Sequence, residues 1–350
     1  MKRIGFNNDN RNGIFKPVGK KKYSRMKKIL AFLLLAGTIT SCYKDYINDF
    51  DYDAIYIPIQ LDVRTFVVGE GMKFDFGVEL AGVRENTRDR IVTYQIDNSL
   101  LTADALSRLK GGQAYIAAAT APVTALQPLP VNYYTLSNTN QMVIKKGDHN
   151  ARVTIKPDSA KFLTDVASII PTYALGIRIM TADADSLLSS KKTAVIGVKF
   201  ENMLFGSYWH GGVTMVKDAA DANVIDTITY FTQIPVSEVK TWSLKTIAPN
   251  AVAANGYSDL TSPAGMEFAL NLNGGTVTIS SLTSGKYAIL PDGASTYNQA
   301  KLLQNRRIYL NYKYKDAAGN WCHAKDTLTF RNRMRDGVNE WQDENPGNYN

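Results

Sequence analysis

The first residues whose type and spacing could do chemistry are the aspartates of Asp49-Phe50-Asp51-Tyr52-Asp53. Glycoside hydrolysis generally needs two carboxyl groups that face one another across the scissile bond, and this run gives no sign of such a pair. A calcium loop that begins at Asp49 needs Gly at its sixth position and Glu at its twelfth. The chain has Ala54 and Gln60 there. We therefore interpret the run as a solvated tether.

Other signatures of catalysis are also missing from the sequence. It contains no Gly-x-Ser-x-Gly nucleophile elbow, and Gly285-Lys286 lacks the upstream glycine of a phosphate-binding loop. The three histidines are well separated, at His149, His210 and His323, and the two cysteines lie far from each other. They form no ligand cluster of the kind that binds zinc. We predict no catalytic residue, no cofactor and no metal, and expect that the chain is not an enzyme.

Aromatic side chains give the best functional lead. An exposed Trp or Tyr ring can stack on the C–H face of a sugar while nearby polar groups bind its hydroxyls. All four tryptophans lie in the second half of the chain. Trp321 follows a Gly-Asn turn and is the first choice for a glycan platform, followed by Trp209 with its neighbour Tyr208. Trp242 alternates with Leu244, so core packing competes with ligand binding there, and core packing is the alternative at each of these positions.

A charged cluster follows the last predicted strand. It contains Arg331, Arg333, Arg335, Asp336 and Glu340. Such side chains can bind ligand hydroxyls or carboxylates, but a salt-bridged closure of the domain is the interpretation that we favour.

The N-terminal region predicts export. Met26-Lys27-Lys28 precedes a short apolar run, 29–36, and a stretch of small residues that ends at Cys42. These are the parts of a secretory signal, and the apolar run is much shorter than the roughly 20 residues of a spanning helix. Ile39-Thr40-Ser41-Cys42 resembles the lipobox of bacterial lipoproteins. The resemblance implies that the Cys42 thiol is lipidated, with 26–42 as the signal peptide and 1–25 as a misassigned or non-native start.

This signal changes the meaning of the net charge. The whole chain carries 40 Lys and Arg against 32 Asp and Glu. Ten of the basic residues and one acidic residue lie in 1–42, which leaves 30 against 31, a net charge of −1, for the rest. We therefore expect no basic stripe that binds phosphates, and no nucleic acid as a partner.

The remaining chain has the pattern of an all-β protein. Short alternating runs rich in Tyr, Thr, Val and Ile recur between turn residues. We predict a tether at 43–54, an immunoglobulin-like β-sandwich at 55–201, an antiparallel β-meander at 204–342 and a polar tail at 343–350. The meander fits a barrel, for example a lipocalin-like one, or a second sandwich. Its clearest hairpin pairs 307–315 with 321–330, and Ile308, Leu310, Tyr312 and Tyr314 should share the inner face.

Several segments carry a family resemblance. Those of the first half are Ala54–Pro58, Phe74–Val78, Ala81–Asn86, Tyr133–Leu136 and Ile144–Gly147, and those of the second are Gly206–Tyr208 and Leu328–Arg333. The first half is similar to a domain of unknown function in surface lipoproteins of Bacteroides and its relatives. That domain also precedes the catalytic domain of some glycoside hydrolase family 18 proteins. The second half resembles a companion domain of unknown function.

Such proteins are commonly encoded beside the outer-membrane transporters and binding lipoproteins that import glycans. The resemblance implies a lipid-anchored protein of the outer membrane, displayed on the cell surface or held in the periplasmic leaflet, that binds a glycan or polysaccharide. A SusC/SusD-type complex would be its neighbour. The alternatives are an adhesion or structural protein that docks a protein partner, such as a transporter, and an uncharacterised glycosidase. Facing carboxylates in a cleft would favour the enzyme, exposed aromatics the glycan, and a large flat apolar patch the protein partner.

Overall fold

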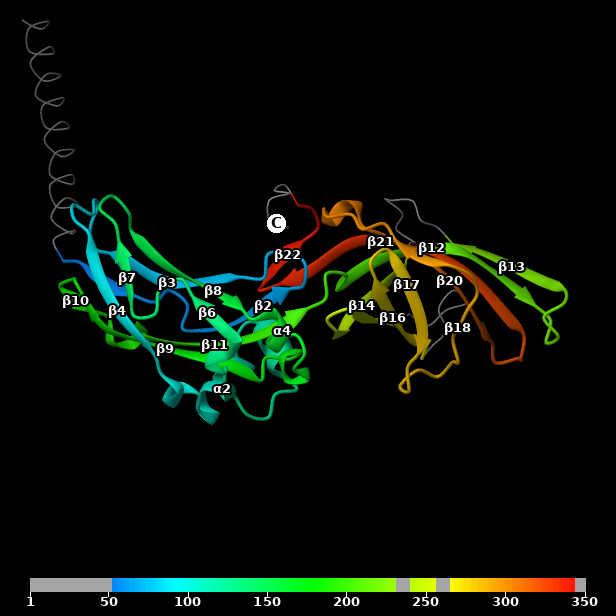
Figure 1. Cartoon of the computed structure of the whole chain (residues 1–350), viewed down its shortest axis with the longest axis horizontal. Coiled ribbons are helices and arrows are strands. Elements are labelled where there is room, and N and C mark those ends of the chain that lie inside the picture. The colour runs from blue at the N-terminus through cyan, green and yellow to red at the C-terminus, as the bar shows by residue number, and fades with distance from the viewer. Residues whose placement is uncertain (1–51, 231–239, 256–264, 344–350) are drawn as a thin grey trace, which may run out of the picture. The chain divides into compact units, whose positions relative to one another are not determined.

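A computed structural model describes residues 52–230, 240–255 and 265–343 of the chain. Residues 54–81 and 85–343 belong to one compact unit. Strands dominate, as predicted for an all-β protein, and they form two sheets in the first half and one in the second (Figure 1). None of the described helices is long and apolar enough to cross a membrane. Cys42 and the signal segment lie outside the described residues, so lipidation remains a prediction.

The first half is a sandwich of two sheets. One sheet has the order β10 (Ser186–Leu187), β1 (Ala54–Tyr56), β3 (Phe74–Ala81), β8 (Asn150–Pro157) and β6 (Tyr134–Leu136). The other has the order β2 (Leu61–Val67), β11 (Thr193–Glu201), β9 (Tyr173–Ala182), β4 (Arg90–Ile96) and β7 (Gln141–Ile144), with β5 (Gln127–Pro128) beside β9. Aromatic rings join the two sheets, since Phe66 of β2 lies 5.2 Å from Phe74 of β3, centroid to centroid. The sandwich thus has its own core between the sheets.

Three helices accompany the sandwich: α2 (Ala103–Lys110), α3 (Ala114–Thr120) and α4 (Ser159–Phe162). The Ala and Leu residues of 101–109 predict a short helix with Thr102 as its cap, and α2 confirms it, because the Thr102 hydroxyl accepts a 3.1 Å hydrogen bond from the Ala105 amide. The Ala- and Pro-containing stretch 114–130 predicts a loop, and α3 corrects that expectation. Its N-cap, Gln113, makes no side-chain capping bond, so the usual sequence signal for a helix start is missing.

Lys146-Gly147-Asp148 stands between two alternating runs, 142–145 and 151–156, and predicts a hairpin turn. The turn forms, but it does not close a hairpin. The preceding strand, β7, pairs with β4, and the following strand, β8, pairs with β3. The chain therefore crosses here from one sheet of the sandwich to the other. A turn signal in the sequence predicts where the chain reverses direction. It does not predict which strands pair with each other.

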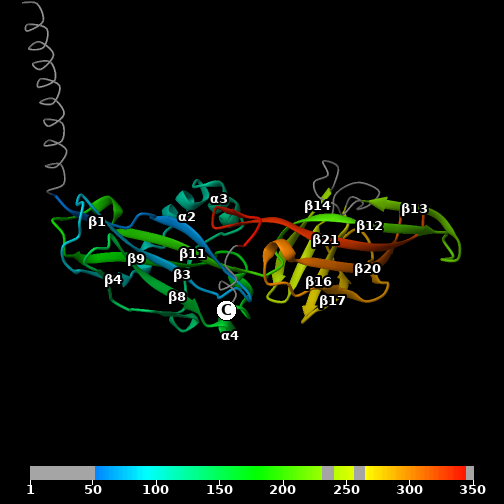
Figure 2. The same ribbon diagram turned by 90° about the horizontal axis from the view of Figure 1, so that it is seen from above.

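The second half is a closed barrel, which selects one of the three predicted alternatives. The ring runs through β12 (Gly206–Lys217), β14 (Lys240–Ala248), β15 (Ala251–Asn255), β16 (Glu267–Asn273), β17 (Thr276–Ser281), β19 (Ser295–Tyr297), β20 (Arg307–Lys315) and β21 (Trp321–Arg335). Pairing of β12 with β21 closes it. Three further strands lie beside the ring: β13 (Val224–Tyr230) on β12, β18 (Leu290–Pro291) on β20 and β22 (Val338–Glu340) on β21. In both ribbon views β21 lies between β12 and β20 (Figure 2).

The barrel core confirms the predicted hairpin face. Ile308, Leu310, Tyr312 and Tyr314 are all buried in it, while the intervening residues of β20 point outward. The turn at 316–320 is held by Asp316, whose carboxylate accepts hydrogen bonds from the Ala318 and Asn320 amides.

Candidate functional site

Two of the predicted ligand-binding residues lie in the core instead. Tyr208 is 0% exposed and Trp242 1% exposed, and both belong to the core cluster of the barrel. Tyr208 packs edge-on against Phe330, and Trp242 stacks on His210. A ring without accessible surface cannot stack on a sugar, so the structure corrects the glycan-platform hypothesis at these two positions. Both side chains point inward on strands whose neighbouring residues point outward, and core packing was the competing interpretation.

Trp321 lies on the outer side of the barrel, at the start of β21, and is partly buried. The ammonium groups of Lys313 and Lys315 lie 4.8 and 4.9 Å from the centroid of its ring. Lys313 and Lys315 come from β20, where residues two apart share a face. Trp321 is therefore an outward-facing ring with two cations beside it, in reach of a ligand on that side.

Trp209 has a similar surrounding on β12. It is partly buried, and the guanidinium carbon of Arg331 lies 4.9 Å from its ring centroid. Tyr208 and His210, its neighbours in sequence, are buried inside the barrel. Trp209 therefore points to the outer side.

The strand register places Trp321 and Trp209 on one continuous surface. Trp321 lies opposite Lys217 of β12 and Lys315 of β20, and Trp209 lies opposite Thr329 of β21. We call this surface the β20–β21–β12 face. Its outward residues are Arg307, Tyr309, Asn311, Lys313 and Lys315 on β20, Trp321, His323, Lys325, Thr327, Thr329 and Arg331 on β21, and Trp209, Gly211, Val213, Met215 and Lys217 on β12.

Tyr309 adds a third ring to this face. It lies opposite Thr327 and is 42% exposed. The sequence placed Tyr309 on the outer face of its hairpin but did not single it out as a ligand residue. The predicted hairpin pairs β20 with β21 correctly, and the pairing of β21 with β12 was the missing information.

His323 lies at the centre of a polar cluster on the same face. Its Nδ1 is 2.7 Å from Asp292 Oδ2 and its Nε2 is 2.7 Å from Asp221 Oδ1. Asp221 also accepts a 3.0 Å hydrogen bond from Lys313 and pairs with Lys217 at 3.2 Å. Hydrogen bonds from Lys313, then from His323 and Lys217, hold the pKa of Asp221 well below its ordinary value. The cluster fastens the turn after β12 and the 292 loop onto the face.

A second polar cluster lies inside the barrel and has no access to ligand. His210 Nε2 is 2.9 Å from Asp326 Oδ2, and both side chains are 0% exposed. Asp326 also accepts hydrogen bonds from the hydroxyls of Tyr312, at 2.7 Å, and Tyr230. Burial, together with the charge of Asp326, raises the pKa of Tyr312 and of Tyr230 well above the ordinary value. This network satisfies buried polar groups and specifies the core.

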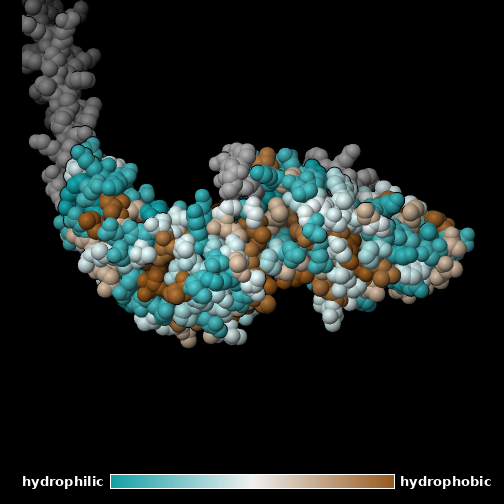
Figure 3. Space-filling model, viewed as in Figure 1, coloured by the Kyte–Doolittle hydropathy of each residue, from teal (hydrophilic) through white to brown (hydrophobic). Residues whose placement is uncertain are grey.

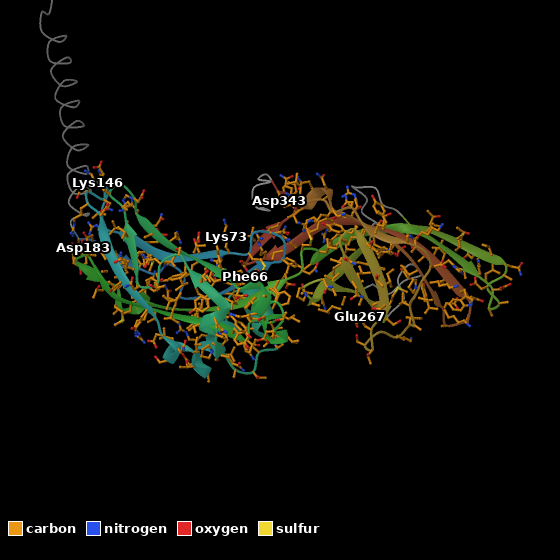
Figure 4. The ribbon with its side chains drawn as sticks, in the orientation of Figure 1. Phe66, Lys73, Lys146, Asp183, Glu267 and Asp343 are labelled. Carbon is orange, nitrogen blue, oxygen red and sulfur yellow. The ribbon has the colours of Figure 1, made fainter. Side chains whose placement is uncertain are left out.

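One cleft, with a volume of about 520 Å³, is highly charged. Its lining includes Arg64, Lys73, Asp75, Arg335, Asp336 and Asp343. Figure 4 labels two of them, Lys73 and Asp343. Burial raises the pKa of Asp336, and Arg64 opposes that rise from 3.9 Å.

The charges of this cleft are largely paired within the protein. Arg64 pairs with Asp62 at 2.7 Å and Arg335 with Glu340 at 2.6 Å. Asp62, which is 2% exposed, adds to the rise in the pKa of Asp336.

Arg333 of the predicted charged cluster is buried and forms ion pairs, one of them with Glu340 of the same cluster. This agrees with the salt-bridged closure of the domain that we favour from the sequence. Arg333 is 2% exposed and donates to both oxygens of Glu70, at 2.9 and 2.6 Å. Arg306 donates to Glu70 at 2.7 Å, and Arg333 also pairs with Glu340. Burial alone would raise the pKa of Glu70, but the hydrogen bonds and charges of Arg333 and Arg306 outweigh it and hold that pKa below its usual value.

The residues outside these clusters give few other leads. Within 52–230, 240–255 and 265–343, no group of three or more His, Cys, Asp or Glu side chains is arranged to hold a metal ion. Cys322 is a buried free thiol. On the side of the molecule drawn in Figure 3, hydrophobic residues form separate areas among hydrophilic ones, which is ordinary for a protein surface.

Comparisons with known proteins agree with this fold. A family model described as "-like, N-terminal domain" matches residues 46–186. A solved structure from Bacteroides ovatus, described as structural genomics of unknown function, has 19% sequence identity and a TM-score of 0.62, and the match covers 84% of this chain and 99% of that one. A Bacteroides ovatus multidomain protein including DUF1735 has 14% identity and a TM-score of 0.42, with 83% and 100% covered.

No curated protein matches the chain. The first of the two solved structures shares the fold at an identity too low to transfer a ligand. Together with the N-terminal family model, it is consistent with the predicted resemblance to Bacteroides proteins of unknown function. The predicted links to glycoside hydrolase family 18 and to SusC/SusD-type systems remain predictions.

Proposed function

We propose that this chain is a non-catalytic, lipid-anchored glycan-binding protein of the outer membrane, held by Cys42 and accessory to polysaccharide use. One observation carries the glycan part: the strand register sets Trp321, Tyr309 and Trp209 on one outward face of three neighbouring strands. Rings on a rigid sheet need little ordering when a sugar binds, because the sheet fixes their positions before contact. Lysine and arginine side chains beside these rings supply donors for hydroxyl and carboxylate oxygens.

The test uses the full chain, purified in detergent, and a broad panel of neutral and acidic polysaccharides. Trp321→Ala and Trp209→Ala should each weaken binding about tenfold, which corresponds to about 1.4 kcal/mol of lost stacking. Trp341→Ala is the matched control, because Trp341 is 58% exposed but lies beyond β22, outside the three strands of the β20–β21–β12 face. Unchanged binding by a folded Trp321→Ala/Trp209→Ala double variant would remove the face from the site.

The same panel tests the absence of catalysis and the anchor. Products released from any polysaccharide at a rate above the no-protein control would argue for the glycosidase alternative. Cys42→Ser should abolish incorporation of labelled fatty acid and release the protein from membranes. Retained labelling in Cys42→Ser would refute the assignment of Cys42.

A further inference from the structure

We propose that the glycan bound by the β20–β21–β12 face is an acidic one, a linear polysaccharide that carries carboxylate or sulfate groups. This inference rests on the proposed function and adds the charge of the ligand. The outward positions of the face hold six cations: Lys217, Arg307, Lys313, Lys315, Lys325 and Arg331. The two that are farthest apart in the chain, Lys217 and Arg331, are separated by 114 positions.

The face has no acidic residue of its own. The one acidic side chain on β12, β20 and β21, all three fully described, is Asp326, which is 2% exposed and points into the barrel. Two carboxylates reach the face from neighbouring turns, Asp221 and Asp292, and both are bonded to His323. Six cations less these two leave about four net positive charges, whereas residues 43–350 together carry −1. The expectation of no basic stripe is therefore wrong, because net charge does not report how charges are distributed among faces.

Three of the cations are available to a ligand. These are Lys315, Lys325 and Arg331, which are exposed and have no ion pair with a described carboxylate. Lys315 lies 4.9 Å from the Trp321 ring centroid, so one acidic sugar can contact the ring and the ammonium group together. Lys325 lies four residues after Trp321 on β21, and its neighbours on the adjoining strands are Val213 of β12 and Asn311 of β20.

The length of the face indicates a polymer. Trp321 and Thr329 are eight residues apart on β21, which is about 27 Å at about 3.4 Å per residue. Trp209 lies opposite Thr329, and Tyr309 lies opposite Thr327. The rings are therefore near the two ends, and Lys313 and Lys325 lie between them. A chain with repeated anionic groups can contact all of these in an extended conformation.

The spacing of the rings favours an acidic glycan over a nucleic acid. Proteins that bind single strands stack successive bases on successive aromatic side chains. Here Trp321 and the row of Tyr309 are six residues apart along β21, about 20 Å. A run of stacked bases does not match this spacing, whereas a sugar acid needs one ring and one cation at each contact.

The experiment compares polymers that differ in charge alone, with the full chain in detergent. The pairs are polygalacturonate against its fully methyl-esterified form, and dextran sulfate against dextran. We expect at least tenfold tighter binding to one acidic member than to its neutral partner, and weaker binding as ionic strength rises from 50 to about 500 mM, because salt screens exposed charges. Lys315→Gln/Lys325→Gln should weaken binding of that acidic polymer about fivefold. Lys156→Gln, an exposed lysine on β8, should leave it unchanged.

Each other outcome overturns the inference in a recognisable way. Equal affinity within both pairs, or no binding to either acidic polymer, refutes the acidic ligand, but the glycan function survives if a neutral polysaccharide binds through Trp321. Equal losses in Lys156→Gln and in the double variant show that the face is not the site. Tighter binding to a single-stranded DNA than to every polysaccharide overturns both the acidic glycan and the proposed function.

Discussion

Replacement of Glu70 by alanine should destabilise the protein strongly. Glu70 lies in the turn between β2 and β3 and binds Arg306 and Arg333, whose side chains are 0% and 1% exposed. The variant removes the carboxylate that Arg306 and Arg333 share, while Arg333 keeps its ion pair with Glu340. Removal of one partner of a buried ion pair costs about 3–5 kcal/mol, because the remaining charge is desolvated without compensation. For about 300 folded residues the entropy of unfolding is about 0.6 kcal/mol/K, so that loss lowers Tm by roughly 5–8 °C.

The matched control is a glutamate–arginine pair on the surface. Glu79 and Arg152 are 2.6 Å apart, as close as Glu70 and Arg333, but their side chains are 26% and 45% exposed. Solvent screens such a pair, so Glu79→Ala should cost about 0–1 kcal/mol. Urea unfolding followed by tryptophan fluorescence measures both losses. Similar losses below about 1 kcal/mol in both variants would show that burial of the Glu70 network is not what makes it stabilising.

The pH dependence provides a second readout for Glu70. Its pKa is lowered in the folded protein from an ordinary value of 4.5. A carboxylate with a lowered folded pKa stabilises fully above its unfolded pKa and loses that contribution as pH falls through the folded value. The stability difference between the wild type and Glu70→Ala should therefore be constant near neutral pH and shrink below about pH 4.5. A difference that grows on acidification would contradict this assignment.

Further predictions concern the barrel. Asp326→Asn should lower the free energy of unfolding by about 2–4 kcal/mol, because His210 and two tyrosine hydroxyls then face an amide inside the core. Urea unfolding measures this loss, and a loss under about 1 kcal/mol would contradict the buried network. Gly212→Ala should destabilise by more than 1 kcal/mol, since Gly212 has φ +152° and an added Cβ would lie 2.2 Å from the Lys325 carbonyl oxygen; wild-type Tm would refute this. Asp221→Asn should lower Tm at neutral pH and converge with the wild type as pH falls below 3.8, since the folded pKa is depressed; parallel Tm curves would refute it. Burial raises the pKa of the Cys322 thiol, so alkylation should be slow until urea unfolds the protein, and rapid labelling of the folded chain would contradict its burial.

The sequence predicted those parts of the fold that depend on local pattern. Alternation over 307–315 assigned each residue of β20 to the correct side because a strand repeats every two residues. The Ala-rich strand β15 was not predicted, since alanine has a low β propensity and its strand is fixed by neighbours on both sides. Trp242 could not be told from Trp209 by residue type alone, because one points into the barrel and the other out of it.

The charge of the candidate site depends on information that no local pattern contains. Lys217, Trp321 and Lys315 form one row across three strands, yet Lys217 and Trp321 are 104 residues apart in the chain. Each strand alone carries an unremarkable number of lysines. The positive face arises because strand pairing aligns the outward positions of three strands. Asp326, the single aspartate on these strands, points inward and is hydrogen-bonded within the core network. The barrel therefore separates its charges by side of the sheet, and this separation gives residues 43–350, which carry a net charge of −1, one outward face with about four net positive charges.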